Sequence, residues 1–254
     1  MTFTTLTVED TDTHTLVRLN RPEVRNAIDQ AMVDDLHAVC DGLERDPRTL
    51  VITGCEVEGR SGRRGIFASG ADITQLRERR REDALAGINS RIFDRIAKLP
   101  MPVIAAVDGF ALGGGAELAL AADFRLGTEA VRFGQPETNL GIIAAAGGLW
   151  RLREITGEQI AKEILFAGRV LTGAECVEHG VLLSLHEPDA LLDAAAELAG
   201  RIATQDPLAV RVAKRVFTMP REAHPAVDEL AQAILFESPA KFDRMQAFID
   251  RKKK

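Results

Sequence analysis

Residues Pro102–Leu118, PVIAAVDGFALGGGAEL, carry the strongest indication of the fold. Its first part, Pro102–Val107, is almost continuously apolar, which predicts a strand buried on both faces. Asp108 and Gly109 follow as turn residues, and the triplet Gly113–Gly115 predicts the start of a helix that ends at residue 121 or 122. A strand, a glycine-marked turn and a helix in this order predict an α/β interior.

Two glutamates stand twenty positions apart, each beside glycines. Glu117 follows Gly113–Gly115, and Glu137 ends the segment Phe133-Gly134-Gln135-Pro136-Glu137. Two carboxyl groups at one reacting centre can divide acid and base work between them. Glycines at a helix start expose backbone N–H groups that attract negative charge. The combination predicts chemistry at a carbonyl group without a metal.

The glycine triplet has two other interpretations. A dinucleotide-binding Gly-x-Gly-x-x-Gly fingerprint fails because Leu118 stands where the third glycine is required, and the chain has no Gly-Lys-Ser/Thr phosphate loop. In the second interpretation, the glycines serve tight helix–strand packing and Glu117 only caps the helix start. The functional interpretation makes one backbone N–H of the triplet half of an oxyanion hole.

Glu137 and a second glycine-marked loop also allow two interpretations each. Glu137 is an exposed loop acid, or it lies in an apolar pocket where its neutral form is favoured and a proton stays available near neutral pH. The loop Phe67–Asp72 supplies another backbone donor, or it is an ordinary loop in which Asp72 caps the next helix.

The amino-acid composition indicates what kind of protein this is and which partners it does not favour. The 254 residues are 46% apolar, and 32 basic against 38 acidic residues give a formal charge of −6. We therefore expect one sizeable globular core and neither nucleic acid nor an anionic membrane as the main partner. The three cysteines and five histidines are scattered without metal-ligand spacing, which predicts reduced, mostly buried thiols and structural or exposed histidines.

Localisation follows from the same kind of evidence. Residues 1–20 lack the cationic start and apolar run of a secretory signal. No apolar segment reaches the roughly 18 residues that a membrane-spanning helix needs. We expect a cytoplasmic protein.

The pattern along the chain predicts an α/β core at 1–195 and a helical region at 196–254. Period-two and period-3.6 spacing predict the following elements. Strands are expected at Phe3–Val8, Thr15–Leu19, Thr49–Thr53, Phe124–Leu126 and Val131–Phe133, and a surface loop at Glu56–Gly65. Helices are expected at Ile28–Leu43, from Ile66–Asp72 through Arg77–Arg81, at Ala144–Ile155 and through most of the remaining chain.

Taken together, these segments resemble the enoyl-CoA hydratase/isomerase (crotonase) superfamily. The resemblance is carried by four motifs, which are spread over most of the chain. They are Leu19–Pro22 with Arg25–Ala27, Phe67–Ile73, Pro102–Leu118 and Phe133–Glu137. The resemblance implies a spiral of ββα units with a helical C-terminal region that trimerises, and pairing of two trimers into a hexamer.

The resemblance also implies roles for residues. The backbone N–H groups of Ala71 and Gly114 would form the oxyanion hole for the thioester oxygen of an acyl-CoA. Glu117 would deprotonate the water that attacks the β-carbon of a trans-2-enoyl-CoA, and Glu137 would deliver a proton to the α-carbon, giving syn addition and a 3-hydroxyacyl-CoA. No metal or redox cofactor is implied, because coenzyme A is part of the substrate.

Coenzyme A itself would be held partly by the early loops, and the resemblance points to four positions there. These are Arg25, Ala27, Ala68 and Ala71. Phe248 and Arg251 of the last helix match an aromatic and a basic residue that reach the coenzyme A of an adjacent subunit. An arginine can grip phosphate, although spacing alone fits an exposed basic helix end equally well.

One segment departs from the family pattern. Where the family commonly has Pro-Gly-x-Gly-Gly-Thr-Gln-Arg-Leu, this chain has Ala144–Leu152, with Ala145 in place of a glycine and Leu149-Trp150 in place of polar residues. We expect Ala145 to add a methyl group close to the acyl pocket. The departure leaves open another reaction of the superfamily, such as double-bond isomerisation or ring chemistry. A CoA-binding or nucleic-acid-binding relative without turnover is a separate alternative, and the acidic net charge and the presence of Glu117 and Glu137 argue against it.

Overall fold

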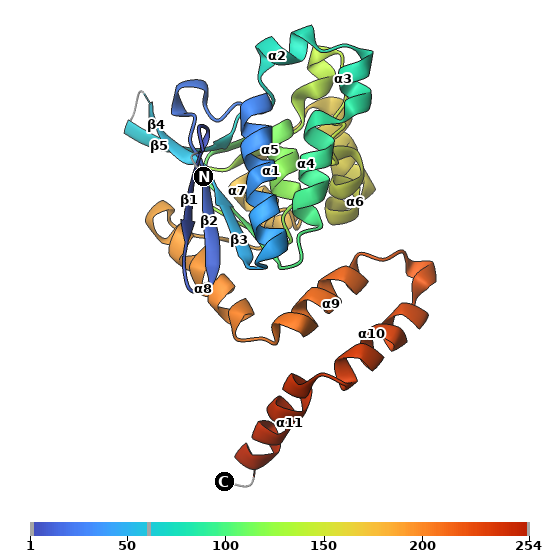
Figure 1. The fold of residues 1–254 in the computed structure, drawn as a ribbon. Coiled ribbons are helices and arrows are strands. Elements are labelled where there is room, and N and C mark those ends of the chain that lie inside the picture. Colours follow the sequence, from blue (N-terminus) through green and yellow to red (C-terminus); the bar gives the residue numbers. More distant parts are fainter. Residues whose placement is uncertain (1–2, 60–61, 253–254) are drawn as a thin grey trace. The chain divides into compact units, whose positions relative to one another are not determined.

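The computed structural model describes residues 3–59 and 62–252 (Figure 1). The chain divides into two compact units at the boundary between Gly200 and Arg201. The first unit holds all the strands in the part of the chain that is described, and the second is helical. None of the described helices has the length and apolar character needed to cross a membrane.

The strands build two sheets in the first unit. They are β1 (Leu6–Asp10), β2 (His14–Leu19), β3 (Thr49–Thr53), β4 (Cys55–Gly59), β5 (Gly62–Ala68), β6 (Val103–Val107), β7 (Phe110–Leu112), β8 (Phe124–Gly127), β9 (Arg132–Gly134), β10 (Leu171–Thr172) and β11 (Ser184–Leu185). One sheet has the order β1-β2-β3-β6-β8-β11 and the other β10-β9-β7-β5-β4. Pairing is parallel from β2 to β11 and from β5 to β9, and antiparallel at the remaining pairs.

Helices and short 3-10 helices (η) connect and cover these strands. They are η1 (Pro22–Val24), α1 (Gln30–Arg45), α2 (Ile73–Glu78), α3 (Arg81–Ala86), α4 (Ile88–Ala97), α5 (Gly114–Leu120), η2 (Pro136–Leu140), α6 (Gly148–Ala167), α7 (Gly173–Glu178), η3 (Pro188–Ala190), α8 (Leu191–Ala203), α9 (Pro207–Phe217), η4 (Arg221–Ala223), α10 (Ala226–Phe236) and α11 (Pro239–Arg251).

The order of the elements describes a spiral. Strand β3 belongs to the first sheet, the β4–β5 hairpin to the second, and helices α2 to α4 follow. The same alternation recurs with β6, β7 and α5, and again with β8, β9 and α6. Each turn of the spiral thus adds a strand to each sheet and then a helical segment, which confirms the predicted ββα architecture.

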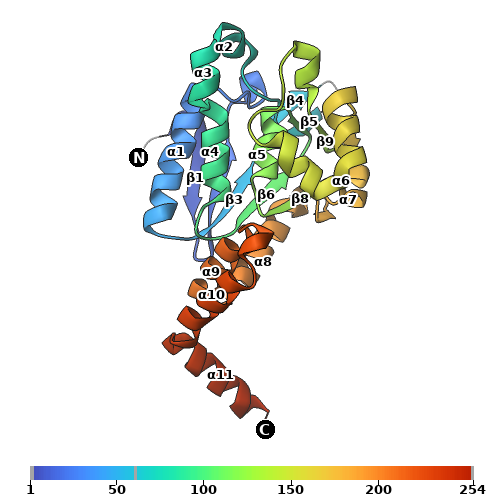
Figure 2. The same ribbon diagram turned by 90° about the vertical axis from the view of Figure 1, so that its right-hand side faces the viewer.

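Helices α1 and α4 run side by side in both views (Figures 1 and 2) and contribute buried residues to the core of the first unit, which also includes residues of both sheets and of α5, α6 and α7. Helix α1 begins at Asp29, whose carboxylate accepts a hydrogen bond from the Met32 N–H at 2.9 Å. Its buried residues recur every three or four positions, as one face of a helix requires. They are Met32, Val33, Leu36, Val39, Cys40 and Leu43.

The predicted surface loop at Glu56–Gly65 is wrong. Most of this segment forms the antiparallel hairpin of β4 and β5, in which Cys55 pairs with Ile66 and Val57 with Arg64. Glu56 and Glu58 are exposed while Cys55 and Val57 are half-buried, so the alternation of a strand is present. The high charge of the segment hid this pattern, because charged residues on the exposed face of an edge strand resemble loop composition. Residues 60 and 61 lie outside the described part.

The helix predicted from Ile66–Asp72 through Arg77–Arg81 is also corrected. Residues 66–68 belong to β5, and helix α2 begins only after Asp72, whose side chain accepts from the N–H groups of Thr74 and Gln75. The chain then breaks at Arg79, and a new helix starts where the Asp83 carboxylate accepts from the Arg80 N–H at 2.8 Å. Two short-range caps therefore override a continuous helical pattern. The interpretation of Asp72 as a capping residue is confirmed.

Two further boundaries differ from the prediction. Helix α6 starts at Gly148 instead of Ala144, and it runs to Ala167 with non-helical backbone at Gly157. The helical spacing over Val227–Lys254 corresponds to two helices, because the chain leaves α10 after Phe236 and Pro239 is the first residue of α11.

Asn26 fixes the loop that precedes α1. Arg25 and Asn26 both have positive φ angles, 54° and 55°, which side-chain-bearing residues seldom adopt. The fully buried Asn26 amide holds this loop to β5, because its Nδ2 donates to the carbonyls of Ile66 and Phe67 at 3.1 and 3.0 Å. Its Oδ1 accepts from the Arg21 N–H at 2.8 Å. A single buried side chain thus satisfies three backbone groups.

We expect Asn26→Ala to lower the free energy of unfolding by about 2–4 kcal/mol, because the substitution leaves buried backbone groups without partners. Urea unfolding followed by circular dichroism measures this difference. Asn20→Ala is the matched control, since Asn20 is exposed and should change stability by less than about 0.5 kcal/mol. Equal stability of the Asn26→Ala and Asn20→Ala proteins would contradict this role of Asn26.

Candidate active site

Glu117 lies in the first turn of α5, and its side chain is turned into the protein. Only 4% of the residue is exposed. Its Oε1 accepts hydrogen bonds from the backbone N–H groups of Ala146 at 2.6 Å and Gly148 at 2.9 Å. The interpretation of Glu117 as a helix cap therefore does not hold, because its partners lie at the start of α6. Burial raises the pKa of Glu117 to about 7, despite these two hydrogen bonds, which favour the charged form.

Glu137 lies in η2, directly after Pro136, and it is 9% exposed. The expectation of an exposed loop acid is thus wrong. Burial raises the pKa of its carboxyl group above the ordinary range of glutamates. The orientation of the buried Gln135 amide that satisfies both of its ends turns the nitrogen toward the carboxyl oxygens of Glu137. In this orientation Gln135 Nε2 lies 3.0 Å from Oε1 and 3.1 Å from Oε2 of Glu137.

The two glutamates line one cavity of about 630 Å³. The negative charge of Glu137 contributes to the raised pKa of Glu117, and the positive charge of the buried Arg151 acts in the opposite direction. Two carboxyl groups that interact in this way titrate as a pair, with pKa values that belong to the pair. Burial, with the charge of Glu137, therefore favours the protonated form of Glu117 in this cavity.

The glycine triplet allows the backbone at the start of α5 to lie close to Glu137 on one side and to β5 on the other. Gly113 has φ 50°, and a Cβ on it would stand 3.0 Å from Oε1 of Glu137. A Cβ on Gly115 would stand 2.3 Å from the carbonyl oxygen of Ala68, which is closer than non-bonded atoms approach. Helix α5 can pack against β5 and leave room for the Glu137 carboxyl only because these residues lack side chains.

The backbone N–H groups of Ala71 and Gly114 lie at this cavity. Gly114 is the first residue of α5, so its N–H has no partner within the helix. The nitrogen of Ala71 lies 3.4 Å from the point where a Cβ on Gly114 would be. On either side of Ala71, the Gly70 carbonyl accepts from Ile28 and the Asp72 N–H donates to Ile28, and no acceptor is found for the Ala71 N–H among the described residues. Both groups are available to a ligand.

The cavity wall is mostly apolar, with charged and polar groups from α2 to α4. An apolar wall with a few polar groups is typical of a binding site for a small molecule. The other lining residues include Ile73, Leu76, Ile88, Leu140, Ile142, Ile143 and Ala145, with Arg79, Arg80, Asp83, Asn89 and Ser90. The position of Ala145 in this wall agrees with the expected methyl group near the acyl pocket. Leu149 and Trp150 are not among the lining residues, and both are partly exposed.

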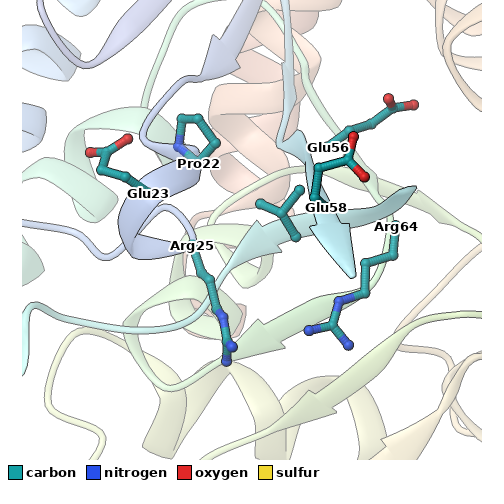
Figure 3. A pocket seen from close by; sticks show the side chains of 7 residues that line it. Pro22, Glu23, Arg25, Glu56, Glu58 and Arg64 are labelled. Carbon is teal, nitrogen blue, oxygen red and sulfur yellow. The ribbon is translucent and has the colours of Figure 1, made fainter. Parts of the chain in front are cut away.

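A second, open pocket of about 550 Å³ lies between η1 and the β4–β5 hairpin. Figure 3 shows the guanidinium groups of Arg25 and Arg64 on the same side of this pocket, with the carboxylates of Glu23, Glu56 and Glu58 directed the other way. The Arg25 carbonyl accepts from the N–H of Ser69, which lines the cavity of the two glutamates. Backbone pairing therefore places Arg25 next to that cavity.

The other residues expected to hold coenzyme A are distributed differently. Ala27 is half-buried, and its carbonyl accepts from Arg21 Nη1 at 2.5 Å. Ala68 is fully buried in β5 and has no surface for a ligand. Phe248 and Arg251 lie on α11 in the second unit, where Phe248 is 56% exposed and the Lys252 ammonium lies 4.8 Å from its ring centre. Their approach to an adjacent subunit stays a prediction.

Several groups at the site carry no recognisable signal in the sequence. Gln135 stands inside a motif of the family, but only its burial beside Glu137 shows its contact. The N–H groups of Ala146 and Gly148 reach Glu117 from 29 and 31 positions away in the chain. Asn89 has no sequence signal, because it is a single amide in a helical pattern.

The three cysteines, Cys40, Cys55 and Cys176, are free thiols. Burial raises the pKa of the Cys40 and Cys176 thiols to about 12, so both stay protonated at neutral pH. In residues 3–59 and 62–252 no group of three or more His, Cys, Asp or Glu side chains is placed to hold a metal ion.

Comparison with known proteins agrees with this architecture. The model of the enoyl-CoA hydratase/isomerase family matches residues 10–254, so the chain belongs to this family. A short-chain-enoyl-CoA hydratase of Clostridium acetobutylicum is 33% identical over 94% of this chain and 92% of its own length. A crotonyl-CoA hydratase of Syntrophomonas wolfei is 31% identical over 100% and 98%. The solved structure of an enoyl-CoA hydratase from Bacillus anthracis, 29% identical, superposes with a TM-score of 0.89 over 98% and 97% of the two chains.

The raised pKa of Glu117 predicts a pH-dependent stability. The folded chain binds this proton more tightly than the unfolded chain, so the resulting stabilisation is complete below about pH 4.5 and is lost as the pH rises through about 7. Glu117→Gln keeps an oxygen for the two N–H groups and removes the titration. The free energy of unfolding of Glu117→Gln minus that of the natural chain is the quantity to compare. We expect this difference to be larger at pH 8 than at pH 4.5 by about 2–3 kcal/mol.

Urea unfolding at the two pH values gives this difference. The exposed Glu129 provides the matched control variant, Glu129→Gln, whose stability relative to the natural chain should not change between pH 4.5 and pH 8. The same pH dependence in the natural and the Glu117→Gln proteins would show that Glu117 does not titrate in a buried site.

Proposed function

We propose that the protein is an enoyl-CoA hydratase that adds water to a trans-2-enoyl-CoA and forms the 3-hydroxyacyl-CoA. The observation that carries this proposal is the meeting, in one cavity, of two buried carboxyl groups and two backbone N–H groups that have no acceptor among the described residues. Family membership and the hydratase names of the relatives give further support.

The N–H groups of Ala71 and Gly114 would bind the thioester oxygen. Attack of water at the β-carbon moves electrons toward this oxygen, and two donors already directed at it lower the barrier. Gly114 contributes in addition the positive end of the α5 dipole. Loss of one such donor typically costs about 10²–10³ in rate.

The two carboxyl groups would divide the proton transfers. Glu117, ionised, takes a proton from water as the oxygen bonds to the β-carbon, and Glu137, protonated, gives a proton to the α-carbon. One proton is taken up and one is released, so the pair must return a proton from Glu117 to Glu137 before the next turnover. Gln135 would hold the Glu137 carboxyl in place through its amide nitrogen.

The proposal extends to the rest of the substrate and to the assembly. Arg25 lies beside the cavity, and we propose that it meets the phosphate-bearing end of coenzyme A. Phe248 and Arg251 would reach the coenzyme A bound by an adjacent subunit of a homotrimer or homohexamer. We further propose a cytoplasmic location and a reaction that uses no metal or redox cofactor.

The direct test is an assay with crotonyl-CoA that follows loss of the conjugated double bond. We expect Glu117→Gln and Glu137→Gln each to reduce kcat by at least about 10²-fold while a saturated acyl-CoA still binds, because each removes one proton-transfer group. Glu129→Gln is the control and should keep full activity. Full activity of either cavity variant would refute its assigned role, and double-bond migration without hydration would favour isomerisation.

The paired carboxyl groups also predict the pH profile of kcat/KM. With both ionised there is no acid, and with both protonated there is no base, so the rate should be bell-shaped. Because burial raises the pKa of both groups, the maximum should lie at a higher pH than for two ordinary glutamates. A rate that stays constant from pH 4 to pH 9 would contradict catalysis by this pair.

A further inference from the structure

Asn89 lies on the wall of the same cavity, as the second residue of α4, and the proposed reaction does not use it. Its Nδ2 lies 3.6 Å from the point where a Cβ on Gly114 would be, and the Ala71 nitrogen lies 3.4 Å from that point. The side-chain amide therefore stands beside the two backbone N–H groups at the reacting centre.

Arg79 fixes the orientation of this amide. Arg79 Nη1 donates to Asn89 Oδ1 at 3.1 Å, and a guanidinium group has only donors. The amide oxygen must therefore face Arg79, which leaves the NH₂ group to face the region near Gly114. Throughout the part of the chain that the structure describes, Nδ2 has no protein acceptor. A donor at a largely apolar wall gains most from a ligand that brings an oxygen.

Two different roles for Asn89 fit the structure less well. It does not cap α4, because the N-cap residue is Gly87 and the Asn89 side chain accepts its hydrogen bond from Arg79. It is also not required for the thioester oxygen, since a carbonyl oxygen has two lone pairs and the N–H groups of Ala71 and Gly114 can occupy both.

We propose that Asn89 is a specificity residue, whose Nδ2 donates a hydrogen bond to an oxygen carried by the acyl chain. The cavity then favours acyl-CoA esters with a hydroxyl or carbonyl oxygen a few carbons from the thioester over plain hydrocarbon esters. This inference rests on the proposed function only in taking an acyl-CoA as the ligand, and it does not require hydration.

The test uses binding of saturated esters, which carry no double bond to hydrate. Two pairs differ by a terminal hydroxyl against a methyl group of similar size: 4-hydroxybutyryl-CoA against pentanoyl-CoA, and 5-hydroxypentanoyl-CoA against hexanoyl-CoA. Isothermal titration calorimetry gives Kd for each. Asn89→Leu should shift the ratio of Kd values toward the methyl ester by about tenfold in at least one pair, as loss of one hydrogen bond predicts.

Two more variants sharpen the comparison. Asn139→Leu makes the same chemical change at an exposed residue of η2 that does not line the cavity, and it should leave both ratios unchanged. Arg79→Met keeps Asn89 but releases its amide, so it should shift the ratio in the same direction and by less. The Arg79→Met protein also tests the inference through its own ratio of Kd values if the Asn89→Leu protein does not fold.

Three outcomes would overturn the inference. Unchanged ratios in both pairs would show that Asn89 does not sense the acyl oxygen. An equal loss of affinity for all four esters would show that Asn89 acts on the thioester or the coenzyme A, which all four esters share. No binding of any ester would remove the acyl-CoA ligand and the proposed function together, whereas a shifted ratio without crotonyl-CoA hydration would refute only the proposed reaction.

Discussion

A carboxyl group withdrawn from water must be given hydrogen bonds by the protein, and in this chain the backbone supplies them. Glu117 is bound by two N–H groups from the start of α6, and those groups are available only because the helix begins at Gly148. These two hydrogen bonds join α5 to the start of α6 and hold the residues just before α6 in place. Even so, the two bonds do not offset burial fully, so the pKa of the Glu117 carboxyl group stays raised, to about 7.

The spiral makes this arrangement possible. Each turn contributes a strand to both sheets, so the loops that follow β5, β7 and β9 come to neighbouring positions in the second sheet. The segments that follow these strands carry Ala71, Gly114 and Glu137, and the first and last of these residues are 66 positions apart in the sequence. Parallel strands place their carboxyl ends at one edge, and this edge is where the cavity forms. The fold thereby brings together backbone donors and carboxyl groups from distant parts of the sequence.

Much of this could be predicted from the sequence, because the decisive signals are local. The apolar run before Gly109 and the glycines before Glu117 predict strand, turn and helix directly, and Glu137 stands within a motif of the family. The hairpin of β4 and β5 could not be predicted in the same way, because Glu56, Glu58 and Arg64 mask the alternation of its strands. Gln135 and Asn89 could not be recognised, since their contacts with Glu137 and Arg79 depend on where the folded chain places them.

We infer that the carboxyl groups of Glu117 and Glu137 share one buried site and titrate together. Carbon-13 NMR of protein with labelled glutamate carboxyl groups measures this directly, with Glu117→Gln and Glu137→Gln used for assignment. We expect the Glu117 signal to titrate near pH 7 and its midpoint to move to lower pH in Glu137→Gln, where the neighbouring charge is gone. A midpoint near the ordinary 4.5 in the natural chain, or one that the Glu137 substitution leaves unchanged, would show that the two groups do not share a buried site.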